Sequence, residues 1–440
     1  MRPLADKSRR TGCGPRAINC GDLETMKRTI VVDAFTTGRY LPEALRERGV
    51  EVRHIMSKQP SDYFAEEQID PHSQVWQNNS TVLMELKEWS ADSVVAGSET
   101  GVELADYLAS TLNLDGNDPR TSIVRRDKAE LHKTLRDANV ATPRSVVVTS
   151  AALAVQMIEE AHLCLPLIVK PARSAGSDRV RRCSTRQAVD LAITDALADT
   201  NLFGERTNGM VVIQEFLEGV EFAVNTVSKN GSHFICEIWR HNKRIIDNRP
   251  VYDVEHAVPI ESVNEELIEY VKLILDTVGV RYGAAHLELF VTERGPVLID
   301  FGARLSGGML PQVTESFFGA SQFTALVNLL CAGELPAPQL QGSIHQDLAI
   351  KNLIFPYEKG YFTPTANERI SHLSSVVGMH LNKSSLKRTV DLPSSPGYVY
   401  LAGPTEKVAD DIETLRQWEA CCDDPDSLFA NMAEANATAC

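Results

Sequence analysis

Glu288 and Asp300 are the two residues whose types and spacing first point to chemistry. Residues 284–291 and 296–301 are rich in β-branched and apolar side chains, and they predict two strands joined by a polar turn of hairpin length. If Arg294 lies at the centre of that turn, the two carboxylates oppose each other with Cβ atoms about 5 Å apart. Facing carboxylates repel, so the pair needs a cation, and oxygen-only ligands suit Mg²⁺. A solvated hairpin edge with ordinary charges is the alternative.

Arg304 follows this pair on a loop that is rich in glycine (Gly302, Gly307 and Gly308). Its guanidinium group is a fork of hydrogen-bond donors, and such a fork binds a carboxylate or a phosphate through two parallel bonds. The hairpin and the loop after it therefore combine a candidate cation site with a candidate anion site.

Lys170 is a second candidate for phosphate chemistry. It ends a buried-type strand over residues 167–169, and a loop of small residues follows that includes Ser174, Gly176 and Ser177. Backbone N–H groups of such a loop can approach phosphate oxygens, and the lysine can neutralise them. The lysine precedes the loop, so this is not the GxxxxGK[ST] motif. An ordinary β-hairpin connection would also fit the pattern.

The composition is that of an ordinary globular protein. The 440 residues, 43% of them hydrophobic and 23% charged, are enough for two to four domains. A net charge of −15 disfavours nucleic acid and anionic membranes as partners. No apolar run approaches the roughly 20 residues that span a bilayer, and residues 1–25 lack the apolar core of a signal peptide. We therefore expect a cytoplasmic protein.

The nine cysteines are scattered along the chain, with no CxxC pair and no Cys/His cluster of zinc spacing. A chain of this length needs no disulfide framework. We interpret them as reduced thiols.

The elements that position these residues begin with an open α/β domain over residues 26–119, after a disordered tail or an over-called start at residues 1–25. The predicted strands are 29–35, 50–56 and 93–96, and the predicted helices are 39–48 and 102–112. Glu99 lies in the loop GSETG at the carboxyl end of a strand, where open α/β sheets bind ligands. It is either a helix-start residue favoured by the helix dipole or a contact for a substrate amine. The domain has no GxGxxG motif, so a dinucleotide is not indicated.

A charged helix is predicted from residue 120 to about Ala138, and it carries Lys128 and Lys133. From this segment alone, both lysines are interpreted as solvated surface charges. The pattern further along predicts strands 208–216, 221–228 and 233–240, helices 186–198 and 265–277, and a hairpin turn at residues 229–231.

Four motifs in the same order and spacing carry a family resemblance. Lys128, VKPARSAGS around Lys170, IQEFLEGVEF, and HLE followed by Asp300 and Arg304 together resemble the ATP-grasp superfamily of carboxylate–amine ligases over roughly residues 120–335. The stretches GSETG, VYDVEH and LIDFGARLSGG are similar to the bacterial L-amino-acid ligases, which join amino acids into dipeptides or make related antibiotic amides.

The resemblance implies an α/β protein in which an N-terminal open α/β domain precedes a two-lobed ATP-grasp fold and a small C-terminal α+β domain. The implied boundaries are 26–119, then 120–340 with a small lobe at about 145–217, then 341–440 with a disordered end. The implied partners are ATP and small-molecule amino acids, and a homodimer is left open.

The resemblance also implies roles for individual residues. Those for ATP are Lys128 and Lys170 at the phosphates, Ser174, Gly176 and Ser177 in the lid loop, Glu215 and Leu217 at adenine, and Glu221 at the ribose. Glu288 and Asp300 become ligands of one or two Mg²⁺ ions, with Mn²⁺ as an alternative. Arg304 and His256 are the catalytic candidates, with a structural histidine as the favoured alternative for His256, and Glu99, Arg304 and Gly307 would bind substrate. Gly302 stands where many members have a metal-binding asparagine, which puts a second metal ion in question.

The implied reaction is attack of a carboxylate on the γ-phosphate of ATP, followed by attack of an amine on the acyl-phosphate, with ADP and phosphate released. One rival hypothesis keeps the fold but assumes a different enzyme: a carboxylase, or a ligase that acts on another metabolite or a carrier-bound acid. Another assumes a non-catalytic nucleotide-binding protein. The presence of all five charged residues, Lys128, Lys170, Glu288, Asp300 and Arg304, argues against it.

Overall fold

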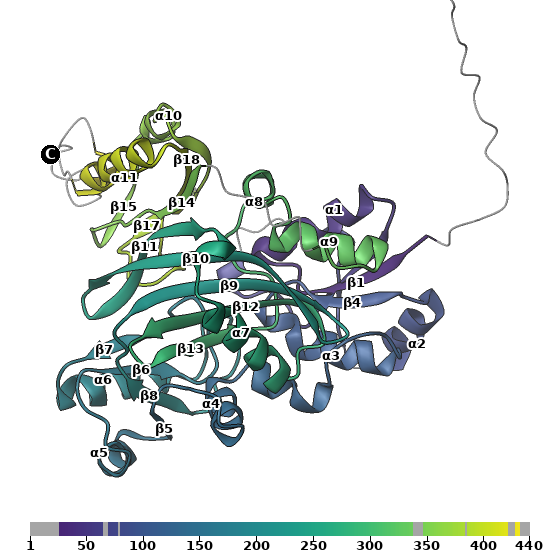
Figure 1. Cartoon of the computed structure of the whole chain (residues 1–440), viewed down its shortest axis with the longest axis horizontal. Helices are drawn as coiled ribbons and strands as arrows, with labels where there is room; N and C mark the ends of the chain where they lie inside the picture. The colour runs from purple at the N-terminus through teal and green to yellow at the C-terminus, as the bar shows by residue number, and fades with distance from the viewer. Residues whose placement is uncertain are drawn as a thin grey trace, which may run out of the picture.

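The computed structural model of the chain describes residues 26–64, 69–77, 80–337, 346–382, 385–420 and 427–431. A large sheet forms the centre of the molecule, the N-terminal sheet and its helices lie on one side, and the small lobe and the C-terminal elements lie at opposite ends of the other side (Figure 1). The predicted tail at residues 1–25 and the predicted disordered end after residue 431 lie outside the described residues.

The N-terminal residues form a four-stranded parallel sheet in the order β3-β2-β1-β4. Its elements are β1 (Arg28–Val32), η1 (Thr36–Tyr40), α1 (Leu41–Arg46), β2 (Glu51–Met56), η2 (Asp62–Phe64), β3 (Gln74–Val75), α2 (Ser80–Trp89), β4 (Ser93–Ala96), η3 (Glu99–Gly101) and α3 (Val102–Thr111). Helices cover both faces, because Ile30 packs against Leu86 and Leu108 while Val31 packs against Leu41. The predicted α/β units are confirmed, and Glu99 lies at the carboxyl edge of the sheet.

The predicted single helix over residues 120–138 is wrong, because the chain breaks at Asp127. The 3-10 helix η4 (Pro119–Arg125) is followed by α4 (Lys128–Asp137). The Asp127 carboxylate accepts two backbone N–H bonds at the start of α4, which is the role of an N-cap residue. The break turns Lys128 inward to 8% exposure, whereas the Lys133 side chain is 64% exposed. The solvated interpretation therefore holds for Lys133 and is wrong for Lys128.

The small lobe is an antiparallel sheet in the order β5-β8-β6-β7, with two helices packed on one face (Figure 1). Its elements are β5 (Ser145–Val148), α5 (Ala151–Glu160), β6 (Leu167–Pro171), β7 (Arg181–Cys183), α6 (Arg186–Ala196) and β8 (Val211–Glu215). Val169 and Ile213 pack against Ile158 and Ile193. The sequence analysis found α6, β6 and β8 and missed α5.

The large sheet is antiparallel throughout, in the order β13-β12-β9-β10-β11-β14-β18-β16. Its first strands are β9 (Val220–Lys229), β10 (Ser232–Ile246), β11 (Arg249–Val258), β12 (Tyr282–Thr292) and β13 (Gly295–Gly302), with η5 (Ile260–Ser262) after β11. Helix α7 (Glu265–Thr277) has the predicted bounds and packs Val271 and Ile274 onto Leu287 and Leu289. Helix α8 (Pro311–Phe318) packs Phe318 against Trp239 of the large sheet, and helix α9 (Gln322–Ala332) packs between the sheet and the N-terminal domain.

The C-terminal residues both extend the large sheet and add a small sheet of their own. Strands β14 (Asp347–Asn352), β16 (Val376–Leu381) and β18 (Gly397–Gly403) continue it, and β15 (Lys359–Phe362), β17 (Leu386–Lys387) and β19 (Phe429–Asn431) form a small second sheet beside α10 (Ala366–Ser371) and α11 (Thr405–Ala420). Fully buried Lys351 joins the two parts, because its ammonium contacts Asp253 of β11 at 3.1 Å and Glu419 of α11 at 2.7 Å.

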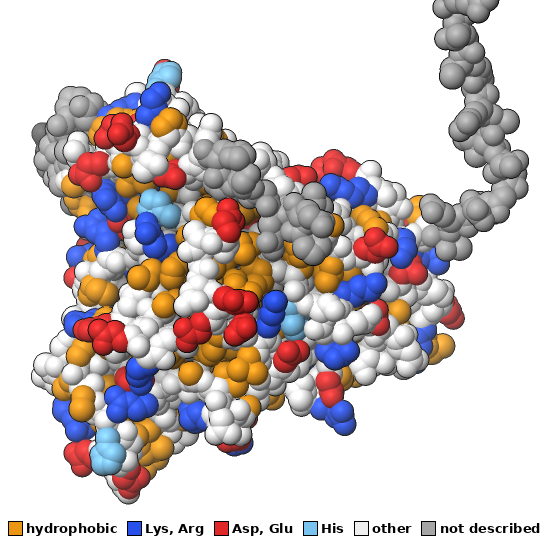
Figure 2. All heavy atoms as spheres, viewed as in Figure 1, with side chains coloured by type: hydrophobic (Ala, Val, Ile, Leu, Met, Phe, Trp, Pro, Cys, Tyr) orange, Lys and Arg blue, Asp and Glu red, His pale blue; other side chains and the backbone are white. Residues whose placement is uncertain are grey.

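The surface and the cysteines agree with the composition. Lys and Arg side chains are interspersed with Asp and Glu on the face shown in Figure 2, so the net charge of −15 is not gathered into one acidic area there. Among the described residues, no helix combines the length and the apolar character that a membrane crossing requires. The described cysteines, Cys164, Cys183, Cys236 and Cys331, are free thiols as predicted.

Candidate active site

Glu288 and Asp300 oppose each other across the hairpin of β12 and β13, as predicted, but the turn and the register that lead to this pairing differ from the prediction. The turn has two residues and is not centred on Arg294, so the ladder begins one residue out of the predicted register. A bulge at Ile299 then restores the pairing. The carbonyl of this bulged residue accepts a hydrogen bond from Lys170 Nζ at 2.7 Å.

Two lysines converge on the Asp300 side of the pair. Lys128 Nζ lies 3.0 Å from Asp300 Oδ1 and also donates to the carbonyl of Ser174. Lys170 is buried at the end of β6, and this burial lowers its pKa to about 8 against the opposing effect of Asp300. Because two ammonium groups meet one carboxylate, this end of the site favours an anionic ligand such as a phosphate.

Three side chains of the large sheet surround Glu288. Its Oε1 accepts a hydrogen bond from the Tyr252 hydroxyl at 2.7 Å and lies 3.4 Å from His286 Nε2. Its Oε2 lies 3.5 Å from Lys243 Nζ, which also sits 4.1 Å from the centre of the Tyr252 ring. Burial opposes ionisation of Glu288, but the charge of Lys243, the His286 hydrogen bond and the nearby histidines together outweigh it and hold the pKa of Glu288 well below its usual range.

Glu221 belongs to the same cluster. Lys243 Nζ donates a hydrogen bond to Glu221 Oε1, and His241 lies between two carboxylates, with Nδ1 at 3.5 Å from Glu221 and Nε2 at 3.3 Å from Glu255. Burial acts to lower the pKa of His241, but these two carboxylates raise it to about 9. His241 is therefore charged at neutral pH. The sequence analysis missed His241, Lys243 and the Tyr252 contact.

The phosphate loop, residues 173–178 after β6, lies beside the Asp300 end of the site, because its Ser174 carbonyl accepts a hydrogen bond from Lys128. Ser174 is 8% exposed, and its hydroxyl donates to Asp178 Oδ2 at 2.7 Å. Gly176 and Ser177 have φ of +64° and +61°, a conformation that favours glycine. The Gly176 carbonyl accepts a hydrogen bond from the Leu392 N–H at 3.2 Å, so a C-terminal turn supports the loop.

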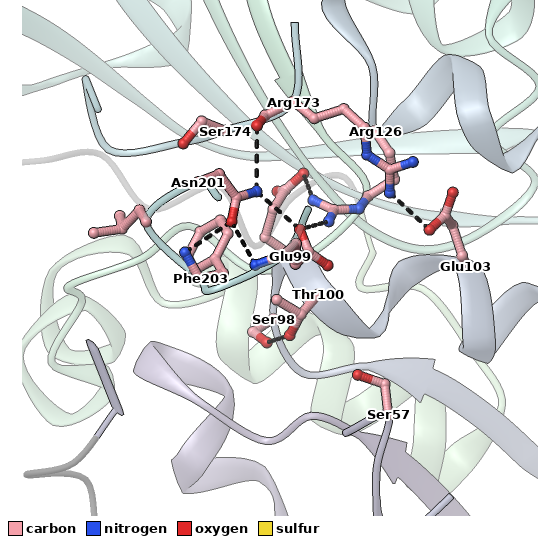
Figure 3. A network of polar contacts seen from close by, with 12 residues as sticks. Ser57, Ser98, Glu99, Thr100, Glu103, Arg126, Arg173, Ser174, Asn201 and Phe203 are labelled. Carbon is pink, nitrogen blue, oxygen red and sulfur yellow. Dashed lines mark hydrogen bonds and ion pairs between the residues drawn. The ribbon is translucent and has the colours of Figure 1, made fainter. Parts of the chain in front are cut away.

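Glu99 is held between two arginines at the carboxyl edge of the N-terminal sheet, in the network that Figure 3 shows in part. Its Oε1 lies 2.7 Å from Arg126 and its Oε2 lies 3.0 Å from Arg304 Nε. Its position at a helix start is confirmed, yet the carboxylate pairs with arginines rather than with the helix end. The same network explains Gly302, because a Cβ there would stand 2.8 Å from Glu99 Oε2. The pair fills the space that an asparagine side chain would need.

The remaining predicted residues have mixed positions. Glu215 ends β8, and its carboxylate is bound by Arg144 and Arg294. Its N–H donates to the Arg144 carbonyl, so the Glu215 carbonyl is the group that could contact adenine. Leu217 follows in the buried connection between the lobes, and Gly307 lies in the turn after Arg304 with open space beside its Cα.

His256 does not join the site. It pairs across the ladder with Arg240 and Ala349, one residue out of step with the His241–Glu255 pair that faces the cluster. Burial lowers its pKa, and the charges that act on it are Arg240, Asp347 and Arg416 rather than the site carboxylates. The structure therefore supports the structural interpretation and not the catalytic one.

The residues present fit a divalent cation. Glu288 and Asp300 oppose each other with oxygen donors, and each carboxylate is paired with a lysine that a nucleotide could draw away. Ligand atoms of Glu221 and Glu288 also lie within 4.8 Å of each other, beside the charged His241. Glu288 and Asp300 would hold the ion, with Glu221 as a neighbouring oxygen donor.

Comparison with known proteins agrees with this geometry. A family model described as an ATP-grasp domain matches residues 163–312. Over 388 residues the chain is 30% identical to dapdiamide A synthase of Enterobacter agglomerans, covering 84% of this chain and 90% of that protein. The crystal structure of L-amino acid ligase from Bacillus licheniformis superposes with a TM-score of 0.68 at 18% identity, covering 89% of this chain and 97% of that one. Carboxyaminoimidazole ribonucleotide synthase from Aspergillus clavatus, complexed with ATP, gives a TM-score of 0.67 at 16% identity over 89% and 98%.

The two lobes with lysines on one side and opposed carboxylates on the other define an ATP-dependent ligase that forms C–N bonds. The chain belongs to the ATP-grasp family, and dapdiamide A synthase is among its relatives. The predicted fold and family are therefore confirmed.

Proposed function

We propose that this protein joins two amino acids, or an amino acid and a related amine, into an amide through an acyl-phosphate, with release of ADP and phosphate. The observation that carries the proposal is the opposed pair Glu288 and Asp300, each paired with a lysine and facing Lys170 and the phosphate loop. A degenerate, non-catalytic member would be expected to lose part of this set.

ATP lies between the lobes in this proposal. Lys128, Lys170 and the backbone of residues 174–177 bind its phosphates, and Glu221 binds the ribose hydroxyls close to Lys243. The carbonyl of Glu215 and the backbone of Leu217 contact adenine. Mg²⁺, held by Glu288 and Asp300, would offset the negative charge of the transferred phosphoryl group.

The first step forms the acyl-phosphate. Arg304 orients the substrate carboxylate. Glu99 fixes Arg304 through its Nε, and the Leu305 carbonyl accepts a hydrogen bond from its Nη1 at 2.9 Å, which leaves Nη2 as the main donor for the substrate. A carboxylate oxygen attacks the γ-phosphorus while the bond to the β-phosphate oxygen breaks and ADP leaves. Lys128 and Lys170 hold the phosphoryl oxygens in line.

The second step forms the amide. The amine nitrogen attacks the acyl carbon, phosphate leaves with its electron pair, and the amine proton passes to phosphate or solvent. Water would attack the same carbon, so the phosphate loop must exclude it. Support for an amine rather than water or bicarbonate as the second substrate comes from the similarity to dapdiamide A synthase along most of both chains.

The number of metal ions, the cellular location, the domain boundaries and the oligomeric state of the protein are also proposals. The Glu99–Arg304 pair beside Gly302 favours one firmly held Mg²⁺ or Mn²⁺ over two. We propose a cytoplasmic location, where ATP is supplied, and domain boundaries near residues 119 and 340. A homodimer would be tested by light scattering.

A phosphate-release screen over pairs of amino acids with ATP and Mg²⁺ tests the proposed function. At least one pair should release ADP and phosphate together with an amide detectable by mass spectrometry. Bicarbonate with amines, and non-amino-acid carboxylates, serve as the competing substrates. Turnover with bicarbonate alone, or release of AMP and pyrophosphate, would contradict the proposal.

A further inference from the structure

The segment between α6 and β8, residues 199–207, crosses from the small lobe to the N-terminal domain, and we name it the bridging loop. It is a compact turn: Asn201 N–H donates to the Glu205 carbonyl at 2.9 Å, and Thr207 N–H donates to the Asp199 carbonyl at 3.0 Å. None of the roles assigned above uses this loop. Its side chains nevertheless lie at the centre of the network in Figure 3.

Asn201 ties the bridging loop to the phosphate loop. Its side-chain NH₂ donates to the Arg173 carbonyl at 3.2 Å and to Glu205 Oε2 at 3.0 Å, while its side-chain oxygen accepts from the N–H groups of Phe203 and Glu205. The side chain is almost fully buried, at 5% exposure. One amide group therefore uses both ends to fix the bridging loop against the start of the phosphate loop.

A second contact runs in parallel. The Leu202 N–H donates to Asp178 Oδ2 at 3.1 Å, and the same carboxylate oxygen accepts from the Ser174 hydroxyl at 2.7 Å. Both ends of the phosphate loop are thus attached to the bridging loop. Movement of one loop must move the other.

Glu205 carries the connection into the substrate side of the site. Its Oε2 lies 2.9 Å from Arg126, which is 4% exposed and lies 2.7 Å from Glu99, and Glu99 in turn holds Arg304 at 3.0 Å. The four side chains alternate in charge, and each buried member depends on its neighbour for compensation. A shift of Glu205 therefore changes the charge compensation of Arg126 and Glu99, and through them that of Arg304.

The bridging loop packs against the N-terminal domain through Phe203. Lys58 Nζ donates to the Phe203 carbonyl at 3.1 Å, and the Phe203 ring lies 5.6 Å from the ring of Tyr63 and 5.9 Å from that of Phe64. Aromatic packing of this kind fixes the loop on the domain that carries Glu99.

We propose that Asn201 and Glu205 are positioning residues that couple closure of the phosphate loop to the arginine that orients the substrate carboxylate. Because of this coupling, the loop closes over ATP fully only when Arg304 is set for the acyl transfer, and the acyl-phosphate is kept from water until the amine attacks. The reaction that suffers when the coupling fails is the second step, since hydrolysis of the acyl-phosphate yields the free acid and phosphate from the same ADP-releasing first step. The inference rests on the proposed function.

The experiment compares Glu205→Gln and Asn201→Ala with Glu103→Gln. Glu103 is a matched control, because it also joins the phosphate loop to the N-terminal domain, through Arg173 at 2.8 Å, while its charge acts on Arg126 less than the charges of Glu99 and Glu205 do. We expect amide formed per ADP released to fall at least about fivefold in the first two variants and to stay at the wild-type ratio in the control. An unchanged ratio in Glu205→Gln, or an equal fall in the control, would overturn the inference.

A second measurement needs no turnover and separates this inference from the proposed function. Hydrogen exchange is followed with a non-hydrolysable ATP analogue at residues 173–178 and at residues 97–101. In the wild type the analogue should slow exchange in both segments, and in Glu205→Gln it should slow only the first. Protection of residues 97–101 that persists in Glu205→Gln, with wild-type melting, would overturn the coupling even if amide synthesis were established.

Discussion

Two hairpins of the large sheet face the same site and divide its charge between them. The β12–β13 hairpin supplies the carboxylates Glu288 and Asp300, and the β10–β11 hairpin supplies the cations His241 and Lys243. The first hairpin by itself would hold two repelling charges in a partly buried place. The second hairpin keeps Glu288 ionised, so that an arriving metal ion exchanges with a lysine instead of having to drive off a proton.

The charges of the β12–β13 hairpin serve the reaction, and the charges of the β10–β11 hairpin serve the stability of the fold. Removing charge from the carboxylate hairpin should remove the reaction and leave the fold, because the paired lysines still have other partners: Ser174 for Lys128 and Glu221 for Lys243. Removing charge from the cation hairpin should weaken the fold, because it leaves buried carboxylates without compensation.

The largest expected effect is on turnover in Glu288→Gln and Asp300→Asn. Each variant keeps the shape of the side chain but loses a metal ligand, so amide synthesis should fall at least about a hundredfold with near-normal melting in the absence of nucleotide. Glu293→Gln in the exposed turn of the same hairpin is the control and should keep full activity. Near-wild-type synthesis in both variants at limiting Mg²⁺ would make the hairpin an ordinary solvated edge.

The cation hairpin is tested by Lys243→Met. Loss of the ammonium leaves Glu221 and Glu288 short of their partner, so the free energy of unfolding in urea should fall by about 3 kcal/mol, with partial recovery in Lys243→Arg. Lys133→Met is matched to it, since Lys133 pairs only with Asp137 on the surface of α4, and it should leave unfolding almost unchanged. Equal effects of the two methionine variants would contradict the division of roles between the hairpins.

A smaller effect is expected from the pH dependence of ATP affinity, through Lys170 at the Asp300 end of the site. The pKa of Lys170 is lowered to about 8, so its charge is present below that pH and is lost as the pH rises through it. If only the ammonium form binds phosphate, the affinity for Mg²⁺-ATP should be about tenfold weaker at pH 9 than at pH 7. Calorimetric titration measures this dependence. Lys170→Arg keeps its charge over this range and should show a flat profile; a decline as steep as that of the wild type would show that another group is responsible.

Local sequence signals were sufficient where turn chemistry and alternation determine the structure. The β12–β13 hairpin, helix α7 and the turn at Asn230–Gly231 follow from residues close in sequence. The pairing of Glu288 with Asp300 was predicted correctly although the assumed centre at Arg294 was not, because the shorter turn and the bulge at Ile299 offset each other.

The cation hairpin shows why the rest could not be predicted. Counting back from the turn at Gly231 pairs Glu221 with Arg240, but a bulge at Cys236 shifts the partner to His241. A further bulge at Asp253 sets Glu255, rather than Val254, opposite His241. Bulges depend on what each strand packs against, and one-residue shifts reverse the face of every following side chain.

Burial of Lys128 is a tertiary effect of the same kind. Its inward direction depends on the Asp127 cap and on the Ser174 carbonyl, which is 46 residues away along the chain. The network of Asn201, Glu205 and Arg126 gave no sequence signal, since Arg126 lies far from the bridging loop in the sequence and the three residues form no motif.

Transfer of a labelled oxygen tests the central claim most directly. The substrate amino acid is prepared with ¹⁸O in its carboxylate, and the inorganic phosphate released with the amide is analysed by mass spectrometry. Attack of the carboxylate on the γ-phosphate of ATP predicts one ¹⁸O atom in each phosphate released with an amide, and unlabelled ADP. Label in AMP, or unlabelled phosphate released together with labelled amide, would contradict the acyl-phosphate route.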